Sequence, residues 1–266
     1  MNTALSTLRA EEHISVSALG TYLRCPRQYQ HRYIFKTPAE HRSSALAFGS
    51  AVHKALAHYY SALQRIDPEP GAEELATVFR DDWAFQLEDP VPVLFGDKET
   101  PDGLTDTGVT MLSVFLENAP RHSGVVEVEM PWSVELWNKD YETLSRLVGV
   151  FDAVVRDESG TYRILEHKTG ARKWSEDKLA FDSQITAYSL VAPLVGLGDA
   201  PVMIQLLTKT KTPAFELYEP KRTEADKNDF SLLAMGVTKA IKAGVFYPVR
   251  DWHCRSCEFS SLCIAG

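Results

Sequence analysis

Three charged side chains in one stretch of the chain have the types and spacing that metal-assisted hydrolysis of a phosphodiester requires. Asp152 stands inside an apolar run, and Glu166 and Lys168 end the next apolar run. Magnesium prefers oxygen ligands and is usually held by one or two carboxylates plus substrate phosphate. A lysine two residues after Glu166 would lie beside a metal-bound water, where it could orient or activate the attacking hydroxide and offset phosphate charge.

Two β-strands joined by a tight turn are predicted to position these side chains. Their residues are rich in β-branched and aromatic types, and a turn-type cluster separates them, at 147–155, 162–165 and 157–160 respectively. Alternation would place Asp152 on the same strand face as Val154, and Glu166 and Lys168 together on one face of the second strand. The acids and the lysine can therefore converge. Considered alone, Asp152 is equally consistent with a charge at a sheet edge.

A helix after the second strand would add two polar side chains. Asp182 begins a helical pattern in which Gln184 and Tyr188 are four residues apart, which puts both on one helix face. On its own, such a pair is more typical of plain protein surface. Beside the acid pair, Gln184 and Tyr188 would hold the substrate strand or the attacking water in line.

Taken in order, these motifs resemble those of the PD-(D/E)XK nuclease superfamily, and within it the RecB-like branch. The matching pieces are Gly149-x-x-Asp152, Glu166-His167-Lys168-Thr169-Gly170 and Gln184-x-x-x-Tyr188. Phe151 precedes the first acid where the superfamily motif has proline. The resemblance implies an α/β fold with a restriction-endonuclease-like core, in which helices flank a central mixed β-sheet. It implies catalytic roles for Asp152, Glu166, Lys168, Gln184 and Tyr188.

A histidine before the hairpin is implied to complete the metal site. His53 lies at the edge of the apolar stripe of a helix predicted over 47–63, where a lone histidine is usually a flank residue. Gly49-x-x-x-His53, however, resembles the RecB-like element whose histidine reaches the metal. The ligands that the resemblance implies for Mg²⁺ or Mn²⁺ are His53, Asp152, Glu166 and the backbone carbonyl of His167.

One further acid is a lesser candidate for this site. Glu129 lies in the strand predicted over 125–137 and resembles an acid that some family members place near the metal. Exposed glutamates are ordinary in strands, so this residue type alone predicts nothing.

The cysteines of the chain divide between its two ends. Three form a CxxC motif followed, after five residues, by another cysteine, and the fourth lies 229 residues before them (254 minus 25): Cys254, Cys257, Cys263 and Cys25. In a chain expected to be cytosolic, this pattern argues for metal ligation over disulfides. Four thiolates suit either zinc or an iron–sulfur cluster.

The order of the cysteines resembles that of the iron–sulfur nucleases of the AddB and CRISPR-associated RecB-like exonuclease type. This resemblance implies a [4Fe–4S] cluster on Cys25, Cys254, Cys257 and Cys263. Zinc is the alternative occupant, and unligated core cysteines are a third interpretation. A metal centre here would tie the two ends of the chain together around the sheet by closing a long loop.

Composition sets the outer bounds. The chain has 266 residues, of which 44% are hydrophobic, and a formal net charge of -8 with a pI near 5.5. This charge argues against a general nucleic-acid coating protein, but not against a nuclease whose basic residues gather around a groove. No apolar run reaches membrane-spanning length. The first residues lack the apolar core of a signal peptide, which predicts a cytoplasmic protein without a membrane partner.

The predicted organisation is a single nuclease domain over 1–266. It comprises a mainly helical N-terminal part, a catalytic sheet with its helix, and a C-terminal helix with the cysteine tail, at 14–120, 124–220 and 221–266. The other predicted helices are 72–88, 108–118 and 224–243, and the other strands are 201–208 and 214–218. Ser17 is the predicted N-cap of the first helix, which Pro26 ends or bends, and 89–106 is a predicted loop.

The residues predict metal-dependent phosphodiester hydrolysis, and the resemblance implies a DNA nuclease, in particular an exonuclease on single-stranded ends, in recombination, repair or CRISPR spacer processing. Because nothing in the chain resembles a P-loop, any helicase activity is expected to come from a partner. A helicase or integrase-type protein partner is open. A homo-oligomer stays open. One alternative is a non-catalytic DNA-binding or scaffold subunit of a helicase–nuclease or spacer-acquisition complex. Another is a restriction-type endonuclease held together by zinc.

Overall fold

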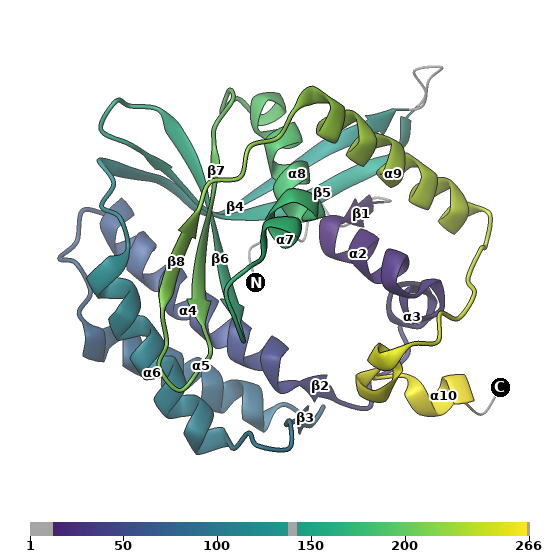
Figure 1. Ribbon diagram of the computed structural model, residues 1–266, viewed down its shortest axis with the longest axis horizontal. Helices are drawn as coiled ribbons and strands as arrows, with labels where there is room; N and C mark the ends of the chain where they lie inside the picture. Colours follow the sequence, from purple (N-terminus) through teal and green to yellow (C-terminus); the bar gives the residue numbers. More distant parts are fainter. Residues whose placement is uncertain (1–12, 138–142, 265–266) are drawn as a thin grey trace.

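The computed structural model describes residues 13–137 and 143–264 and has an α/β fold built on a mixed sheet (Figure 1). The sheet has six strands in the order β1-β5-β6-β7-β8, with β4 paired to β5 as well. The strands are β1 (His13–Ser15), β4 (Gly124–Trp137), β5 (Thr143–Arg156), β6 (Tyr162–Gly170), β7 (Val202–Thr208) and β8 (Phe215–Tyr218). Because β6 and β7 are parallel and β5 and β6 antiparallel, the predicted mixed sheet is confirmed.

Helices connect and cover these strands. In chain order they are α2 (Val16–Arg24), α3 (Pro26–Tyr29), η1 (Gln30–Ile34), α4 (Ser44–Gln64), α5 (Ala72–Glu88), α6 (Pro101–Asn118), α7 (Glu176–Phe181), α8 (Ser183–Val191), η2 (Ala192–Val195), α9 (Glu224–Lys242), η3 (Trp252–Ser256) and α10 (Ser260–Ile264). A two-stranded sheet pairs β2 (Arg42–Ser43) with β3 (Val93–Leu94). Every helix of the described residues is too short or too polar to cross a lipid bilayer.

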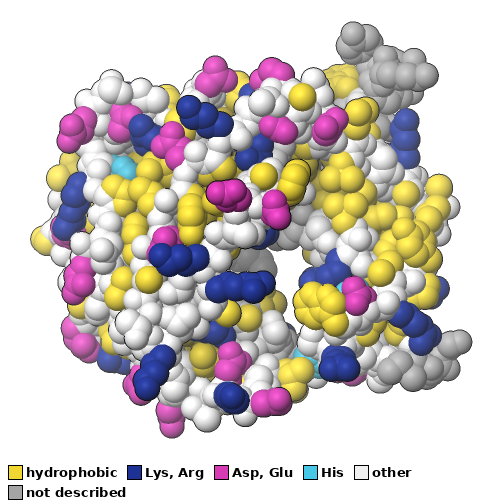
Figure 2. Space-filling model, in the orientation of Figure 1, with side chains coloured by type: hydrophobic (Ala, Val, Ile, Leu, Met, Phe, Trp, Pro, Cys, Tyr) yellow, Lys and Arg dark blue, Asp and Glu magenta, His cyan; other side chains and the backbone are white. Residues whose placement is uncertain are grey.

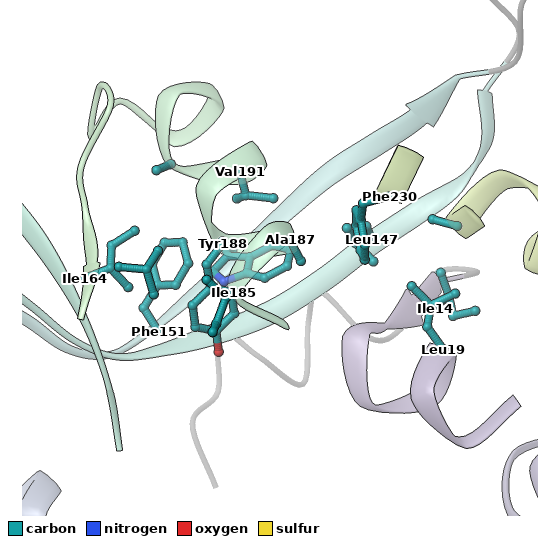
Figure 3. Packing of buried hydrophobic residues seen from close by; sticks show 14 of the residues in the cluster. Ile14, Leu19, Leu147, Phe151, Ile164, Ile185, Ala187, Tyr188, Val191 and Phe230 are labelled. Carbon is teal, nitrogen blue, oxygen red and sulfur yellow. The ribbon is translucent and has the colours of Figure 1, made fainter. Parts of the chain in front are cut away.

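Each face of the sheet packs against its own hydrophobic core. On one face, α4, α5 and α6 contribute Phe48, Phe79 and Phe115 against strand residues such as Leu165. On the other face, α8 packs its Tyr188 against Phe151 near Ile164, as Figure 3 shows. Further along the same core, Phe230 of α9 lies by Leu147, and Leu19 of α2 lies by Ile14. Burial of apolar surface on both faces stabilises the sheet at roughly 25 cal/mol per Å² and fixes its register.

The register of β5 contains an irregularity that the sequence does not predict. Phe151 and Val154 both belong to the core on the α8 side, whereas Ala153 belongs to the core on the α4 side. Strict alternation therefore breaks at Asp152, which was predicted to share a face with Val154. On the paired strand β4, Glu129 lies opposite Asp152, because its neighbours pair with Ala153 and Phe151. Glu129 has a φ of 50°, in the left-handed region. Such local irregularities are common beside active sites because they re-aim a side chain.

Two predicted boundaries are wrong for identifiable reasons. The region 89–106 was predicted as a loop, but α6 begins at Pro101 with Thr100 as its N-cap, because proline is favoured in the first turn. Within α6, a Cβ on Gly108 would lie 2.2 Å from the Phe79 ring, so this glycine serves close helix packing. Helix α2 is capped by Ser15 rather than by Ser17.

Other predictions of local structure are confirmed. Gly160 has a φ of 83° in the turn between β5 and β6. Cys25 is extended between α2 and Pro26, as expected where a proline ends a helix. The absence of a signal peptide was predicted from the first residues, and positions 1–12 lie outside the described residues.

The elements surround an opening. In Figure 1, α2, α3 and α10 lie across this opening from β6 and α4, so the first helices and the last helix share one side of it. Figure 2 shows the opening on the molecular surface, with Lys and Arg side chains at its edge. Several site residues come from the elements that border it.

Candidate active site

The site lies where the sheet forks. Strand β1 pairs with β5 at 146–148, and β6 pairs with β5 at 153–156. Both lie on the edge of β5 opposite β4, because β4 pairs with β5 along both of these segments. Neither β1 nor β6 pairs with residues 149–152, so the backbone edge there is available to side chains. This gap in the ladder is the structural reason that Asp152 faces a cavity.

The two predicted acids meet at this fork. The pair Ala153–Leu165 is the last in the β5–β6 ladder, and Asp152 and Glu166 occupy the next position along it. One carboxylate oxygen of Asp152, Oδ2, accepts a hydrogen bond of 2.7 Å from the backbone N–H of His167. The other, Oδ1, lies 3.4 Å from Nδ1 of His53 on α4. The fork therefore brings His53 and both acids together.

A continuous hydrogen-bond chain links the second acid to the helix. The ammonium of Lys168 donates to Glu166 Oε1 and, over 2.7 Å, to Gln184 Oε1. The amide Nε2 of Gln184 donates to the Tyr188 hydroxyl over 2.8 Å, and this hydroxyl donates to the carbonyl of Val150 over 2.5 Å. Tyr188 thus satisfies a carbonyl of the unpaired edge of β5, and Gln184 fixes the position of the lysine.

The two acids have very different pKa values. Burial raises the pKa of Glu166 to about 7, and the charge of Asp152 adds to this effect. Burial acts in the same sense on Asp152, but His53 and the His167 N–H outweigh it and lower the pKa of Asp152 to about 2. Burial would lower the pKa of Lys168, yet the charge of Glu166 outweighs it and raises that pKa. Lys168 therefore holds its proton firmly.

A cavity of about 600 Å³ opens onto these groups, and its lining includes His53, Asp152, Glu166, Lys168, Gln184 and Tyr188. We refer to this space as the acid cavity. Glu166 is only 3% exposed, and its Oε2 has no hydrogen-bond partner among the described residues. An unpaired carboxylate oxygen beside a second acid is a donor set that fits a hard divalent cation.

The comparison with protein families agrees with this geometry. The family model described as the PD-(D/E)XK nuclease superfamily matches residues 13–264. The chain belongs to this superfamily. The match spans the N-terminal helices, the forked sheet and the C-terminal tail, so it covers every element that lines the acid cavity. The RecB-like iron–sulfur branch is a finer assignment that this match leaves as a prediction.

A solved structure shows the same fold. A protein from Eubacterium rectale named "Putative exonuclease" is similar with a TM-score of 0.61 at 16% sequence identity, over 97% of this chain and 91% of that chain. The structure of SSO0001 has 18% identity over 98% of this chain and 93% of that chain, but its TM-score of 0.44 supports no argument. No curated protein matches the chain. The superfamily match confirms the predicted α/β fold with a restriction-endonuclease-like core.

His167 contributes its backbone to the acid cavity and its side chain to the core. The ring is 2% exposed and stacks on Tyr60 with ring centroids 5.3 Å apart. Burial lowers its pKa to about 4, so the ring is neutral at physiological pH. Within this nuclease, a role for the His167 carbonyl as a metal ligand stays a prediction.

Glu129 occupies an intermediate position. It lies across from Asp152 on β4, because the pairs on either side are Val128–Ala153 and Met130–Phe151. Its side chain is exposed and is not part of the acid-cavity lining. The geometry therefore places Glu129 near the site but outside its lining.

The four cysteines meet in a second cavity. A space of about 200 Å³ is lined by Cys25, Cys254, Cys257 and Cys263, and we refer to it as the cysteine cavity. All four thiols are free. The backbone N–H of Val249 points at the sulfur of Cys25 over 3.5 Å, and that of Asp251 at the sulfur of Cys254 over 3.5 Å. The predicted association of the two chain ends is present.

Buried contacts from Glu258 dock the tail. Its Oε2 accepts a hydrogen bond of 2.8 Å from Gln28 and its Oε1 one of 2.9 Å from Arg32. Among residues 13–137 and 143–264, no group of three or more His, Cys, Asp or Glu side chains is arranged to hold a single metal ion. Magnesium, by contrast, needs only one or two carboxylates besides water and phosphate.

One functional element was missed at the sequence level. The polar stretch before Asp182 was not assigned a helix, yet it contains α7, which is capped by Ser175 and brings Lys178 and Phe181 to the acid cavity. Ser175 followed by Glu176 and Asp177 is an N-terminal helix signal that could have revealed it. Only six residues long, α7 was too short for periodicity to detect.

Proposed function

We propose that this chain is a divalent-metal-dependent deoxyribonuclease that degrades DNA from single-stranded ends. The observation that supports it most is the unbroken hydrogen-bond chain from Glu166 through Lys168 and Gln184 to Tyr188, beside a second buried acid. The free Oε2 of Glu166 beside a second acid at this cavity also favours a site for a cation over a simple ion pair with Lys168.

The residues that would hold Mg²⁺ or Mn²⁺ are Asp152 and Glu166, with His53 and the His167 carbonyl assisting. When bound, such an ion supplies Lewis-acid polarisation of a phosphate oxygen and lowers the pKa of water. Asp152 is ionised at neutral pH because of its lowered pKa, and Glu166 needs to lose its proton to become a ligand.

Lys168 acts through its charge and its hydrogen bonds. Because its pKa is raised, the ammonium stays protonated and serves as a donor and a positive charge rather than as a base. Gln184 aims this ammonium at the cavity, and Tyr188 anchors Gln184 to β5. The pair thus orients the group that offsets negative charge on the phosphate.

The test is degradation of end-labelled single strands with Mn²⁺ or Mg²⁺. The wild-type chain should release short products from a linear strand, leave a circular single strand intact, and act poorly on blunt duplex. Lys168→Ala should abolish this activity and leave the fold unchanged by circular dichroism. Undiminished activity of Lys168→Ala would remove Lys168 from the mechanism, and cleavage of the circle would show an endonuclease.

A helicase or integrase-type partner that delivers a strand end would fit an enzyme of this kind. If the wild-type chain binds DNA but cleaves none of these substrates with either metal, the scaffold interpretation replaces the enzymatic one. Formation of cleavage products therefore distinguishes a nuclease from a DNA-binding subunit.

We further propose that the cysteine cavity holds a [4Fe–4S] cluster. Four free thiols from both chain ends line one cavity, and two of them face backbone N–H groups. In such a cluster each thiolate binds a different iron, so the sulfurs need not surround one ion. Anaerobic purification should give about four irons and four sulfides per chain with visible absorbance. Stoichiometric zinc without sulfide would assign the site to zinc instead.

A further inference from the structure

An exposed aromatic ring stands beside the acid cavity. Phe181 is the last residue of α7, is 81% exposed, and lines the cavity together with Asp152 and Lys168. It belongs to neither hydrophobic core. A single exposed apolar side chain is ordinary on a protein surface, but Phe181 lies in the wall of the cavity that holds both acids, where it can contact whatever enters.

The backbone under this ring is held firmly. Asp182, the next residue, caps α8 by accepting hydrogen bonds of 3.0 and 3.2 Å from the N–H groups of Gln184 and Ile185. Arg222 donates to the carbonyl of Leu179 over 2.6 Å. The backbone under the ring is therefore fixed relative to Gln184, only three residues away. Gln184 in turn holds the ammonium of Lys168.

A cation accompanies the ring. The ammonium of Lys178, one turn before Phe181, lies 4.7 Å from the centre of the Trp174 ring and 2.5 Å from the Asp182 carboxylate. Lys178 also lines the acid cavity. Aromatic rings beside cations are the usual means of holding single-stranded nucleic acid, because each base has a face that can stack and each phosphate carries charge.

A second exposed phenylalanine provides the contrast. Phe85 on α5 is 68% exposed, but it is absent from the linings of the acid and cysteine cavities. Exposure alone is therefore not what distinguishes Phe181. The distinguishing feature is that Phe181 shares one cavity with both acids.

We propose that Phe181 stacks on an unpaired base next to the scissile phosphate and so positions single-stranded DNA for cleavage. A base within a duplex already stacks on its neighbours and offers its face less readily, so the ring favours unpaired ends. This inference rests on the proposed nuclease function and adds the residue that sets strand preference.

The experiment compares Phe181→Ala, Phe181→Trp and the control Phe85→Ala in the full chain. Steady-state cleavage of an end-labelled single strand with Mn²⁺ should show KM raised about 5- to 150-fold in Phe181→Ala, the range expected for loss of one base stack, with kcat changed less. Phe181→Trp should restore KM, and Phe85→Ala should match the wild type. Because both rings are exposed, thermal unfolding should be unchanged in all variants.

A strand with a single abasic residue, moved one position at a time, identifies the stacked base. With the abasic residue at one position, the KM of the wild type should rise by about the factor seen for Phe181→Ala on the intact strand. The KM of Phe181→Ala should not rise further at that position. Equal KM values for wild type and Phe181→Ala would overturn the inference. So would equal losses by both proteins at every abasic position.

A binding measurement keeps this inference separate from the proposed function. Fluorescence anisotropy of a labelled oligonucleotide in Ca²⁺ reports affinity without cleavage. If the wild type cleaves nothing, the nuclease proposal fails, while a 5- to 150-fold weaker affinity of Phe181→Ala still supports stacking. If Phe181→Ala binds the oligonucleotide as the wild type does, Phe181 does not contact DNA, and a protein partner becomes the explanation for its exposure.

Discussion

In the acid cavity, most side chains come from two strands and a helix that follow one another along the chain. The cysteine cavity instead joins Cys25 to three cysteines of the last residues. Strand register places Asp152 next to Glu166, and hydrogen bonds link the lysine, glutamine and tyrosine that follow. The cysteines are held instead by the docking of the tail, in which Glu258 bonds Gln28 and Arg32 and Phe259 stacks on His31.

From this difference we expect the acid cavity to serve catalysis and the cysteine cavity to serve stability. The acid cavity is preorganised by the fold, so a change there should affect chemistry far more than stability. The metal centre proposed for the cysteine cavity would close a very long loop, so a change there should affect stability far more than chemistry. Each prediction below tests one side of this division.

Asp152→Asn should have as large an effect on activity as Lys168→Ala, and a larger one than the other changes described below. The amide cannot supply the negative charge that a divalent ion needs, and we expect a loss of roughly 10³-fold or more in kcat/KM with Mn²⁺. Thermal unfolding should change by only a few degrees, roughly. An unfolding temperature of Asp152→Asn far below that of the wild type would show that the acid is also needed for stability. That result would contradict the difference proposed between the two cavities.

Cys25→Ser should have the largest effect on stability. Loss of the only ligand from the N-terminal end opens the loop, and we expect the free energy of unfolding to fall by about 3–5 kcal/mol in denaturant titrations. Wild-type protein stripped of its cofactor is the control and should unfold like the variant. Unfolding identical to that of the loaded wild type would contradict a bridging role.

Gln184→Ala should have a smaller effect, confined to activity. Without this amide, Lys168 keeps its contact with Glu166 but loses the partner that aims it. Partners of this kind typically account for about 10- to 100-fold in activity. Ser189→Ala, one turn further along α8 and outside the acid-cavity lining, is the matched control and should retain full activity.

The smallest effect is a pH dependence of metal binding. Because the pKa of Glu166 is raised to about 7, its carboxyl is protonated below that pH and needs to release a proton to bind an ion. Calorimetry in buffers of different ionisation enthalpy should show proton release on Mn²⁺ binding at pH 6 that disappears by about pH 8. His53→Gln should reduce this release without abolishing it, because the pKa of His53 is also raised beside Asp152 and an assisting His53 would lose its own proton. Complete loss of the release in His53→Gln would assign the proton to His53 rather than to Glu166.

Much of the site could be predicted because its residues are close in sequence and lie in regular elements. Alternation and helical spacing were sufficient to place Glu166, Lys168, Gln184 and Tyr188. The break at Asp152 could not be predicted, because it depends on the fork between β1 and β6 and on the opposing β4. The start of α6 was missed because Pro101 and Gly103 suggest a loop, although Thr100 caps the helix and Pro101 occupies its first turn. The packing of Phe79 against Gly108 then holds the helix against α5.

The most direct test of the central claim is calorimetric titration of Mn²⁺ into the wild type, Asp152→Asn, Glu166→Gln and Lys168→Ala. If Asp152 and Glu166 bind one ion and Lys168 acts on the phosphate, the wild type and Lys168→Ala should each bind an ion that both acid variants fail to bind. Binding of Mn²⁺ to Asp152→Asn and Glu166→Gln with wild-type affinity would contradict the account.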